Sequence, residues 1–152
     1  PETLVEALKN PNLGWRQHAQ RLLVARKKLD VQPALLKLVQ DKSVDETGLN
    51  AGAVHAIWTY SGLLGPKVVP GATREFVNAG LRHPSAAVRR AVYLGVVAKW
   101  EEEGDYLLVK AVDGHTPFSD PEPSVRVAAL LALADLPHAT TGVEQVVRHI
   151  QD

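Results

Sequence analysis

The amino-acid sequence predicts an all-α fold, a right-handed α-solenoid of about four stacked helix pairs that forms one domain over residues 1–152. Three observations support this prediction. A proline is followed five residues later by an arginine in three separate stretches, apolar residues then recur at steps of three and four, and a second short apolar segment comes afterwards. Because one short helix pair cannot bury its own apolar face, successive pairs must stack around a common core.

Residues 1–10 are expected to be the last helix of a preceding repeat. Thr3 and Glu6 fit the pattern of a capping box, in which two side chains satisfy free amides at the start of a helix. Leu4 and Leu8 form part of an apolar stripe. We therefore expect the array to begin before residue 1.

The first helix of each later unit follows a turn that contains a proline. The matched pairs are Pro11 with Arg16, Pro84 with Arg89, and Pro121 with Arg126. A degenerate copy has His55 in place of the arginine, so the four anchor residues are 39, 34 and 37 residues apart. Since the first helical turn tolerates proline, each copy predicts a turn, a proline and then a helix. The predicted units span about 11–40, 49–82, 84–115 and 121–152.

A second helix is predicted in each unit, over residues 32–40, 72–81, 105–112 and 143–150. Loops of Gly, Pro, Asp and Ser separate the pairs, at 41–48, 65–71 and 113–124. In arrays of this kind the second helices line the concave side, which is the usual binding surface. The candidate contacts on that side are Lys37, Arg74, Lys110 and Arg148.

The repeated phrase resembles the short bacterial type of HEAT repeat, also called the PBS-lyase HEAT-like repeat. Its hallmark, D/H-P-x-x-x-V-R-x-x-A, is matched by Asp120-Pro121 with Val125-Arg126 and Ala129, and in part by His83-Pro84 with Val88-Arg89. The resemblance covers nearly the whole chain. It implies an armadillo-like α-α superhelix that binds proteins, and it specifies a fold and not an activity.

A narrower resemblance covers roughly residues 9–65. The stretches "NPNLGWRQHAQRLLVAR" and "VHAIWTYSGLLG" are similar to the HEAT segment of large bacterial membrane-bound-dehydrogenase-type proteins. Those chains join a sugar-dehydrogenase-like propeller, a HEAT segment and a cytochrome c domain. The resemblance implies a connecting scaffold in an exported or periplasmic redox protein. Without it, a cytoplasmic protein fits the sequence as well.

The composition argues against several classes of function. The chain has 17 basic and 17 acidic side chains, and this balance disfavours a nucleic-acid or anionic-membrane binder. It has no cysteine, so a thiolate metal site or a disulfide cannot form. Its six histidines are scattered, and it has no H-E-x-x-H, G-x-S-x-G or phosphate-loop motif. The sequence therefore predicts a segment with no catalytic residues, no bound metal and no cofactor.

The matched anchors Arg16, His55, Arg89 and Arg126 are predicted to form a structural ladder in which each side chain bonds loop carbonyls or an adjoining unit. Anion binding by the arginines is the alternative. His55 would make its rung sensitive to pH near 6–7, since an imidazole titrates there.

The large aromatic residues give a second set of expectations. Trp15 and Trp58 fall on the apolar stripes and are predicted to pack in the core. Trp100 comes before an acidic run, residues 101–103, which is expected to be a solvated face or a docking point for a basic partner.

The sequence thus favours a non-catalytic scaffold that binds a protein partner or spaces neighbouring domains. A nucleic-acid-binding HEAT-like domain is one alternative, although Lys37, Lys67, Arg74, Arg82, Lys110 and Arg148 exceed the acidic residues of the second segments by only two. A lyase that attaches bilin pigments is another, and it has only the name of the repeat type in its favour.

Overall fold

The computed structural model describes residues 1–64, 70–100 and 117–136. The all-α prediction is confirmed for these residues, which hold seven α-helices and no strand. The α-helices are α1 (Glu2–Glu6), α2 (Leu13–Ala25), α3 (Gln32–Gln40), α4 (Ala51–Leu64), α5 (Pro70–Leu81), α6 (Ala86–Gly95) and α8 (Pro123–Asp135). Short 3-10 helices lie at Ala7–Lys9, Leu29–Val31, Val97–Lys99 and Pro117–Ser119.

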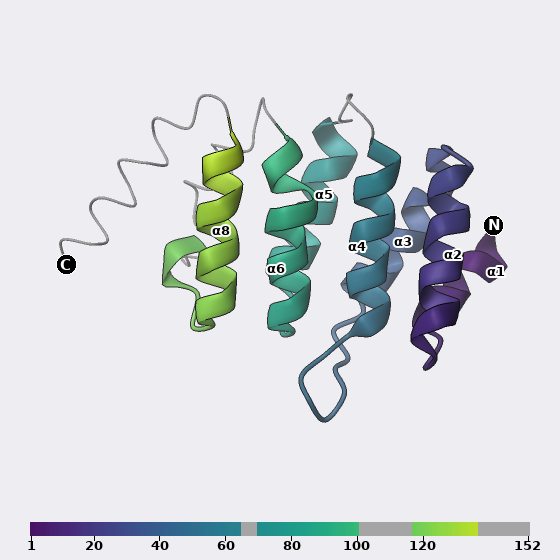
Figure 1. Cartoon of the computed structure of the whole chain (residues 1–152), viewed down its shortest axis with the longest axis horizontal. Coiled ribbons are helices and arrows are strands. Elements are labelled where there is room, and N and C mark those ends of the chain that lie inside the picture. The colour runs from purple at the N-terminus through teal and green to yellow at the C-terminus, as the bar shows by residue number, and fades with distance from the viewer. Residues whose placement is uncertain (65–69, 101–116, 137–152) are drawn as a thin grey trace.

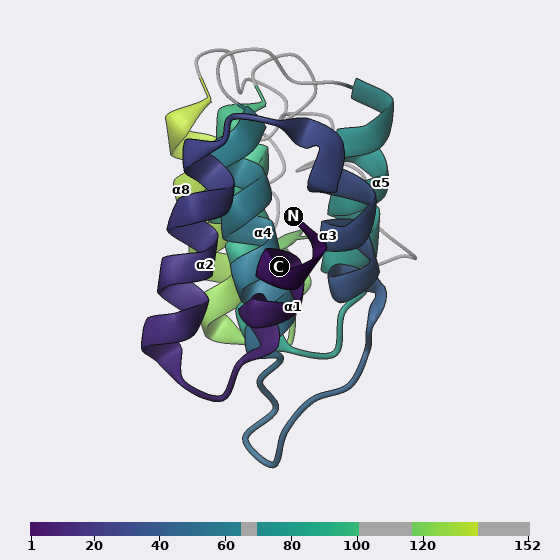
Figure 2. The ribbon, with the colours of Figure 1, turned by 90° about the vertical axis from the view of Figure 1, so that its right-hand side faces the viewer.

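The helices lie in two rows. Helices α2, α4, α6 and α8 stand side by side in one row, here called the front row, and each packs against the next (Figure 1). Helices α3 and α5 form a back row, which packs against α4 and α6 (Figure 2). Helix α1 lies at the α2 end, against α2 and α3.

The hydrophobic core fills the space between the rows. Leu23, Ile57 and Val92 enter it from the front row, and Leu35 and Phe76 enter it from the back row. The rings of Tyr60 and Phe76 stack across the two rows with their centroids 4.2 Å apart. The hydroxyl of Tyr60 shares a 2.8 Å hydrogen bond with that of Thr73, so its buried oxygen is not left unpaired.

Two glycines allow helices to approach closely. A Cβ atom at Gly62 of α4 would lie 2.7 Å from a methyl group of Val24 on α2. A Cβ atom at Gly80 of α5 would overlap Cγ2 of Val92 on α6. A side chain at Gly80 would force α5 and α6 apart, whereas one at Gly62 would require the side chain of Val24 to move.

The starts of the front-row helices differ in detail from the expected pattern. Pro11, Pro84 and Pro121 each lie one residue before the N-cap residue, which is Asn12, Ser85 and Glu122 respectively, and so outside the first helical turn. The capping-box prediction for Thr3 is wrong, because α1 begins at Glu2 and its N-cap is Pro1.

The second helices expected at 32–40 and 72–81 are confirmed. The first has the predicted bounds, and the second begins two residues earlier, at Pro70. The segments 105–112 and 143–150 lie outside the described residues, so the pairing of helices in the last two units stays a prediction.

Candidate binding surface

Three arginines at matched positions make the same contact with the turn that precedes their helix. Each donates from Nη1 to the backbone carbonyls five and six residues earlier. The contacts are Arg16 with Asn10 and Pro11 (2.6 and 2.9 Å), Arg89 with His83 and Pro84 (2.9 and 2.9 Å), and Arg126 with Asp120 and Pro121 (2.7 and 3.3 Å). Each arginine therefore fastens its helix to its own turn through charge-assisted hydrogen bonds.

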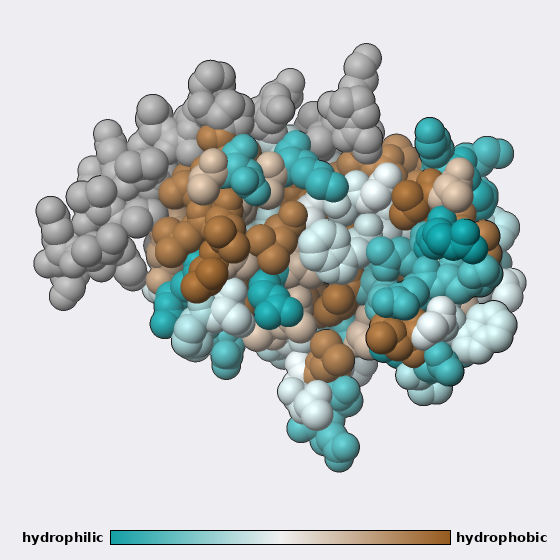
Figure 3. Space-filling model, viewed as in Figure 1, coloured by the Kyte–Doolittle hydropathy of each residue, from teal (hydrophilic) through white to brown (hydrophobic). Residues whose placement is uncertain are grey.

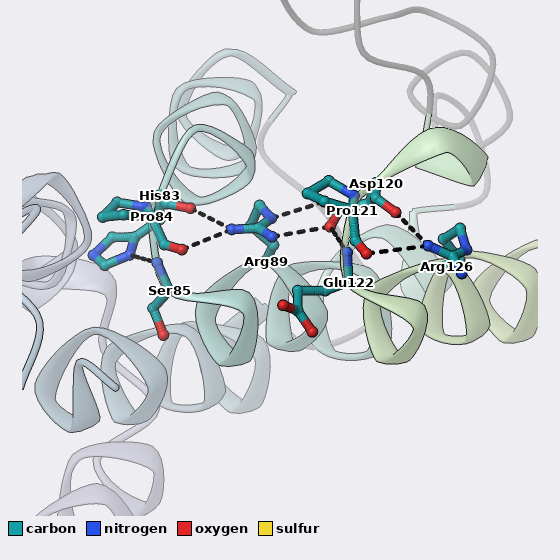
Figure 4. Close-up of polar contacts among 8 residues, drawn as sticks. All are labelled: His83, Pro84, Ser85, Arg89, Asp120, Pro121, Glu122 and Arg126. Atoms are coloured by element: carbon teal, nitrogen blue, oxygen red, sulfur yellow. Dashed lines mark hydrogen bonds and ion pairs between the residues drawn. The ribbon is translucent and has the colours of Figure 1, made fainter. Parts of the chain in front are cut away.

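Arg89 also reaches the next turn along the front row. Its Nε and Nη2 donate to the two carboxylate oxygens of Asp120 at 2.8 and 2.9 Å, in a bidentate pair that is largely buried (Figure 4). Burial opposes the ionisation of Asp120, but hydrogen bonds from Arg89 and from the Glu122 amide, with the charges of Arg89 and Arg126, keep its pKa below the ordinary value. One side chain thus connects two successive turns.

Arg16 lacks this second contact. Its Nε is buried and has no hydrogen-bond partner among the described residues. The position in the next unit that matches Asp120 is Leu49, six residues before His55, and a leucine offers no carboxylate. The turns before α2 and α4 are therefore not connected by an arginine–aspartate pair like that of Arg89 and Asp120.

His55 makes a different contact from the three arginines. Its Nδ1–H donates to Oε1 of Gln20 on α2 at 2.7 Å and not to the turn before α4. Asn50 organises that turn instead. Its Nδ2 donates to the carbonyls of Asp41 and Ser43 at 3.1 and 2.8 Å, and its Oδ1 accepts from the Ala53 amide at 2.9 Å. Sequence reasoning missed Asn50, although an asparagine just before an apolar helix is a recognised N-cap signal.

The surroundings of His55 lower its pKa, first through burial and then through the charge of Arg16. In the unfolded chain the imidazole has its ordinary pKa near 6.5. As the pH falls below that value, the unfolded state binds the proton more readily than the folded state. Protonation of His55 in the unfolded chain therefore lowers the free energy of unfolding as the pH falls below about 6.5. Above neutral pH the imidazole is neutral in both states and has no such effect.

His83 is a buried structural residue that sequence reasoning left among the scattered histidines. It lies in the turn between α5 and α6, where its Nε2–H donates to the Asp41 carbonyl at 2.8 Å and its Nδ1 accepts from the Ser85 amide at 3.0 Å. Burial is the largest influence on its pKa, which is lowered. The neutral ring links the end of α3 to the start of α6.

The predicted core positions of Trp15 and Trp58 are wrong, and the acidic run at 101–103 lies outside the described residues. Trp15 is 60% exposed and Trp58 is 37% exposed, whereas Trp100, next to the acidic run, is 1% exposed. Trp15 lies in the first turn of α2, edge-on to the ring of His18. Trp58 leans across α6, since a Cβ atom at Gly95 would lie 3.4 Å from its ring. Both exposed rings belong to the front row.

Two hollows lie beside these features. One of about 330 Å³ is lined by Asn12, Gly14, Trp15 and His18. Another, of about 500 Å³, lies between α2 and α4 and is lined by Gln17, Gln20, Arg21, Val24, Ala25 and His55. Apolar surface also gathers over α8, where Val127, Leu130 and Leu131 are exposed (Figure 3). The front row thus combines exposed apolar groups with places where side chains of a partner can insert.

Of the expected concave-side contacts, Lys37 and Arg74 are exposed on α3 and α5, while Lys110 and Arg148 lie outside the described residues. A hollow of about 540 Å³ beside α5 is lined by Lys42, Arg74, Glu75 and Arg82, among others. Lys42 joins the two back-row helices by donating to the Ala79 carbonyl at 2.7 Å.

In residues 1–64, 70–100 and 117–136, no group of three or more His, Asp or Glu side chains is placed to hold a metal ion. No helix within the described ranges has the length and apolar character needed to cross a membrane. No protein-family model, curated protein or solved structure matches the chain.

Proposed function

We propose that the chain is a right-handed α-solenoid of about four HEAT-like helix pairs, and that it acts as a non-catalytic scaffold that binds a protein partner. The shared contact of Arg16, Arg89 and Arg126 with their turns supports the repeat assignment, because it recurs at the same offset on three front-row helices. The order of these helices along one row supports stacking in sequence order (Figure 1).

The exposure of Trp15 and Trp58 is the observation that carries the binding function. Trp15 leaves most of a large apolar ring in water, and Trp58 leaves more than a third of its surface exposed. Burying such rings is favourable, and tryptophan is enriched among the side chains that dominate protein–protein affinity. Both rings are on the front row, and Trp15 lines one of its hollows. We therefore place the partner on the front row and not along α3 and α5.

The setting suggested by the narrower resemblance is part of this proposal. In that setting the scaffold would hold a neighbouring domain of the same redox protein or a separate partner. The full reading frame tests it, since a propeller before this segment and a C-x-x-C-H motif after it would support it.

The function is tested by capturing partners from a cell extract with the wild-type chain and then reconstituting the complex from purified proteins. In the Trp15→Ala/Trp58→Ala double variant, the partner's Kd should rise by roughly tenfold or more, because central aromatic anchors typically contribute that much. Val44→Ala is the matched control, because Val44 is also exposed but lies in the 41–48 loop.

A reconstituted complex with the same Kd for the double variant and the wild type would contradict the front-row assignment. A titration with duplex DNA at low salt is run in parallel. Salt-dependent DNA binding without a protein partner would favour the nucleic-acid alternative.

A further inference from the structure

Arg89 and Arg126 hold equivalent positions near the starts of α6 and α8 but have different sets of partners. Arg89 uses Nη1 for its own turn and gives Nε and Nη2 to Asp120. Arg126 uses Nη1 for its turn in the same way. Within the part of the chain that the structure describes, its Nε and Nη2 have no hydrogen-bond partner. Figure 4 shows the two contacts that Nη1 of Arg126 makes with its own turn. Among the described residues, the other two nitrogens of this planar donor group are thus available to an acceptor.

The apolar neighbours of the two arginines show the same difference. Tyr93 lies four residues after Arg89 on α6 and is 5% exposed. Burial and the nearby charge of Asp120 raise its pKa. Tyr93 therefore lies where α6 packs against α8 and the turn before α8. Leu130 is four residues after Arg126 and is 41% exposed, with exposed Val127 beside it. On α6 the residue four positions after the arginine is buried against α8, whereas the equivalent residue on α8 is exposed.

We infer that Arg126, Val127 and Leu130, here called the α8 edge, bind a partner helix whose preceding turn carries an aspartate. The carboxylate accepts hydrogen bonds from Nε and Nη2 of Arg126, as Asp120 does from Arg89, and an apolar side chain of the partner helix covers Leu130. The inference rests on the proposed scaffold function and names the chemistry of one partner.

Two features favour this occupant. The open donor group is cationic, so it selects an anionic acceptor, and its planar fork matches a carboxylate in bidentate geometry. The α6–α8 contact shows within the same molecule that an acidic turn followed by a helix fits this arrangement. A basic or uncharged turn would remove water from the guanidinium group of Arg126 without giving it a charged acceptor, and this desolvation is unfavourable.

A peptide of the protein's own residues 117–136 is a suitable probe, because it holds Asp120 in its turn and the whole of α8. The labelled peptide, with capped termini, is titrated with the full 152-residue chain and followed by fluorescence anisotropy. We expect saturable binding. A peptide with Asp120→Asn should bind on the order of tenfold more weakly, since a hydrogen-bonded charge is lost.

The protein variants give the second half of a double-mutant cycle. Arg126→Gln should weaken binding of the unmodified peptide to a similar extent and remove the difference between the two peptides. Leu130→Asp should abolish binding. Arg90→Gln is the matched control, because Arg90 is an exposed arginine on α6 and its loss should leave the Kd unchanged.

Equal binding by Arg126→Gln and wild type, or no binding at millimolar protein, would overturn the inference. So would binding that Arg89→Gln removes and Arg126→Gln keeps, because the peptide would then be replacing α8 on α6. These outcomes leave the proposed function standing, since its test depends on Trp15 and Trp58 of α2 and α4.

Discussion

Arg89 contributes to the fold through all three nitrogens of its guanidinium group. It satisfies two carbonyls of its own turn and both oxygens of Asp120 in the next turn. The turn carbonyls precede α6 and have no place in its hydrogen-bond ladder, so without the arginine they would need water or another donor. A single residue thus connects local turn geometry with the contact between neighbouring units.

Replacing this residue should be costly. We expect Arg89→Ala to lower the free energy of unfolding by about 1–3 kcal/mol, because the largely buried Asp120 carboxylate and the part-buried His83 carbonyl lose their donor. Arg90→Ala, the adjacent exposed arginine, should change it by less than about 0.5 kcal/mol. Urea unfolding followed by circular dichroism measures both. Equal stabilities of the two variants would rule out a structural role for the Arg89 contacts.

The sequence located residues that belong to a repeated pattern and failed on residues that depend on packing. Matched spacing identified Arg16, Arg89 and Arg126, because residues at the same position in repeated units make the same contact with the preceding turn. His83 has no counterpart in the other turns, since Asn10 and Asp120 stand at its position. Its links to the end of α3 therefore could not be read from a periodic pattern.

The tryptophans show why an apolar stripe does not identify the buried side. Helix α4 packs against α2, α3 and α6, so most of its surface is apolar and only a narrow strip with Trp58 and Gly62 faces water. A helix with neighbours on three sides has no polar face that marks this strip. On α2 the apolar stripe is buried at Ala19 and Leu23 but not at Trp15, so the spacing alone does not show where along the helix burial begins.

At the scale of the element, glycines determine how closely the helices can pack. Gly80 of α5 lies against Val92 of α6, and Val39 and Ile57 are also within 4 Å of where a Cβ atom would lie. With atoms on several sides, a new methyl group has no free space to enter. The bounds of α3 were predictable because Pro33 and the polar loop after Gln40 mark its ends, whereas such close contacts depend on neighbours that are distant in sequence.

Gly80→Ala should therefore lower the free energy of unfolding by about 1–2 kcal/mol, as the overlap exceeds the gain in helix propensity. Gly71→Ala is the matched control in the same helix, since nothing lies within 4 Å of a Cβ atom there. It should leave stability unchanged or raise it by up to about 1 kcal/mol. Thermal unfolding compares the two, and a stabilised Gly80→Ala chain would show that α5 and α6 are less tightly packed than described.

In the molecule as a whole, the front helices form an open row. Helix α2 and helix α8 lie at opposite ends of that row, with α4 and α6 between them (Figure 1). In an open row, Val127 and Leu130 of α8 stay exposed and a further helix can dock on them, whereas a closed bundle would bring α2 and α8 together and cover them. The binding proposals on this surface therefore share one structural premise.

The most direct test of this premise uses the absence of cysteine, which allows one introduced thiol to carry a spin label. With a label at Gln17→Cys, exposed on α2, paramagnetic broadening of amide signals should be strong in α4, weaker in α6 and absent in α8. The last helix lies three interhelical steps of roughly 8–10 Å away. Broadening in α8 as strong as that in α4 would mean that the row closes on itself, and it would contradict the account.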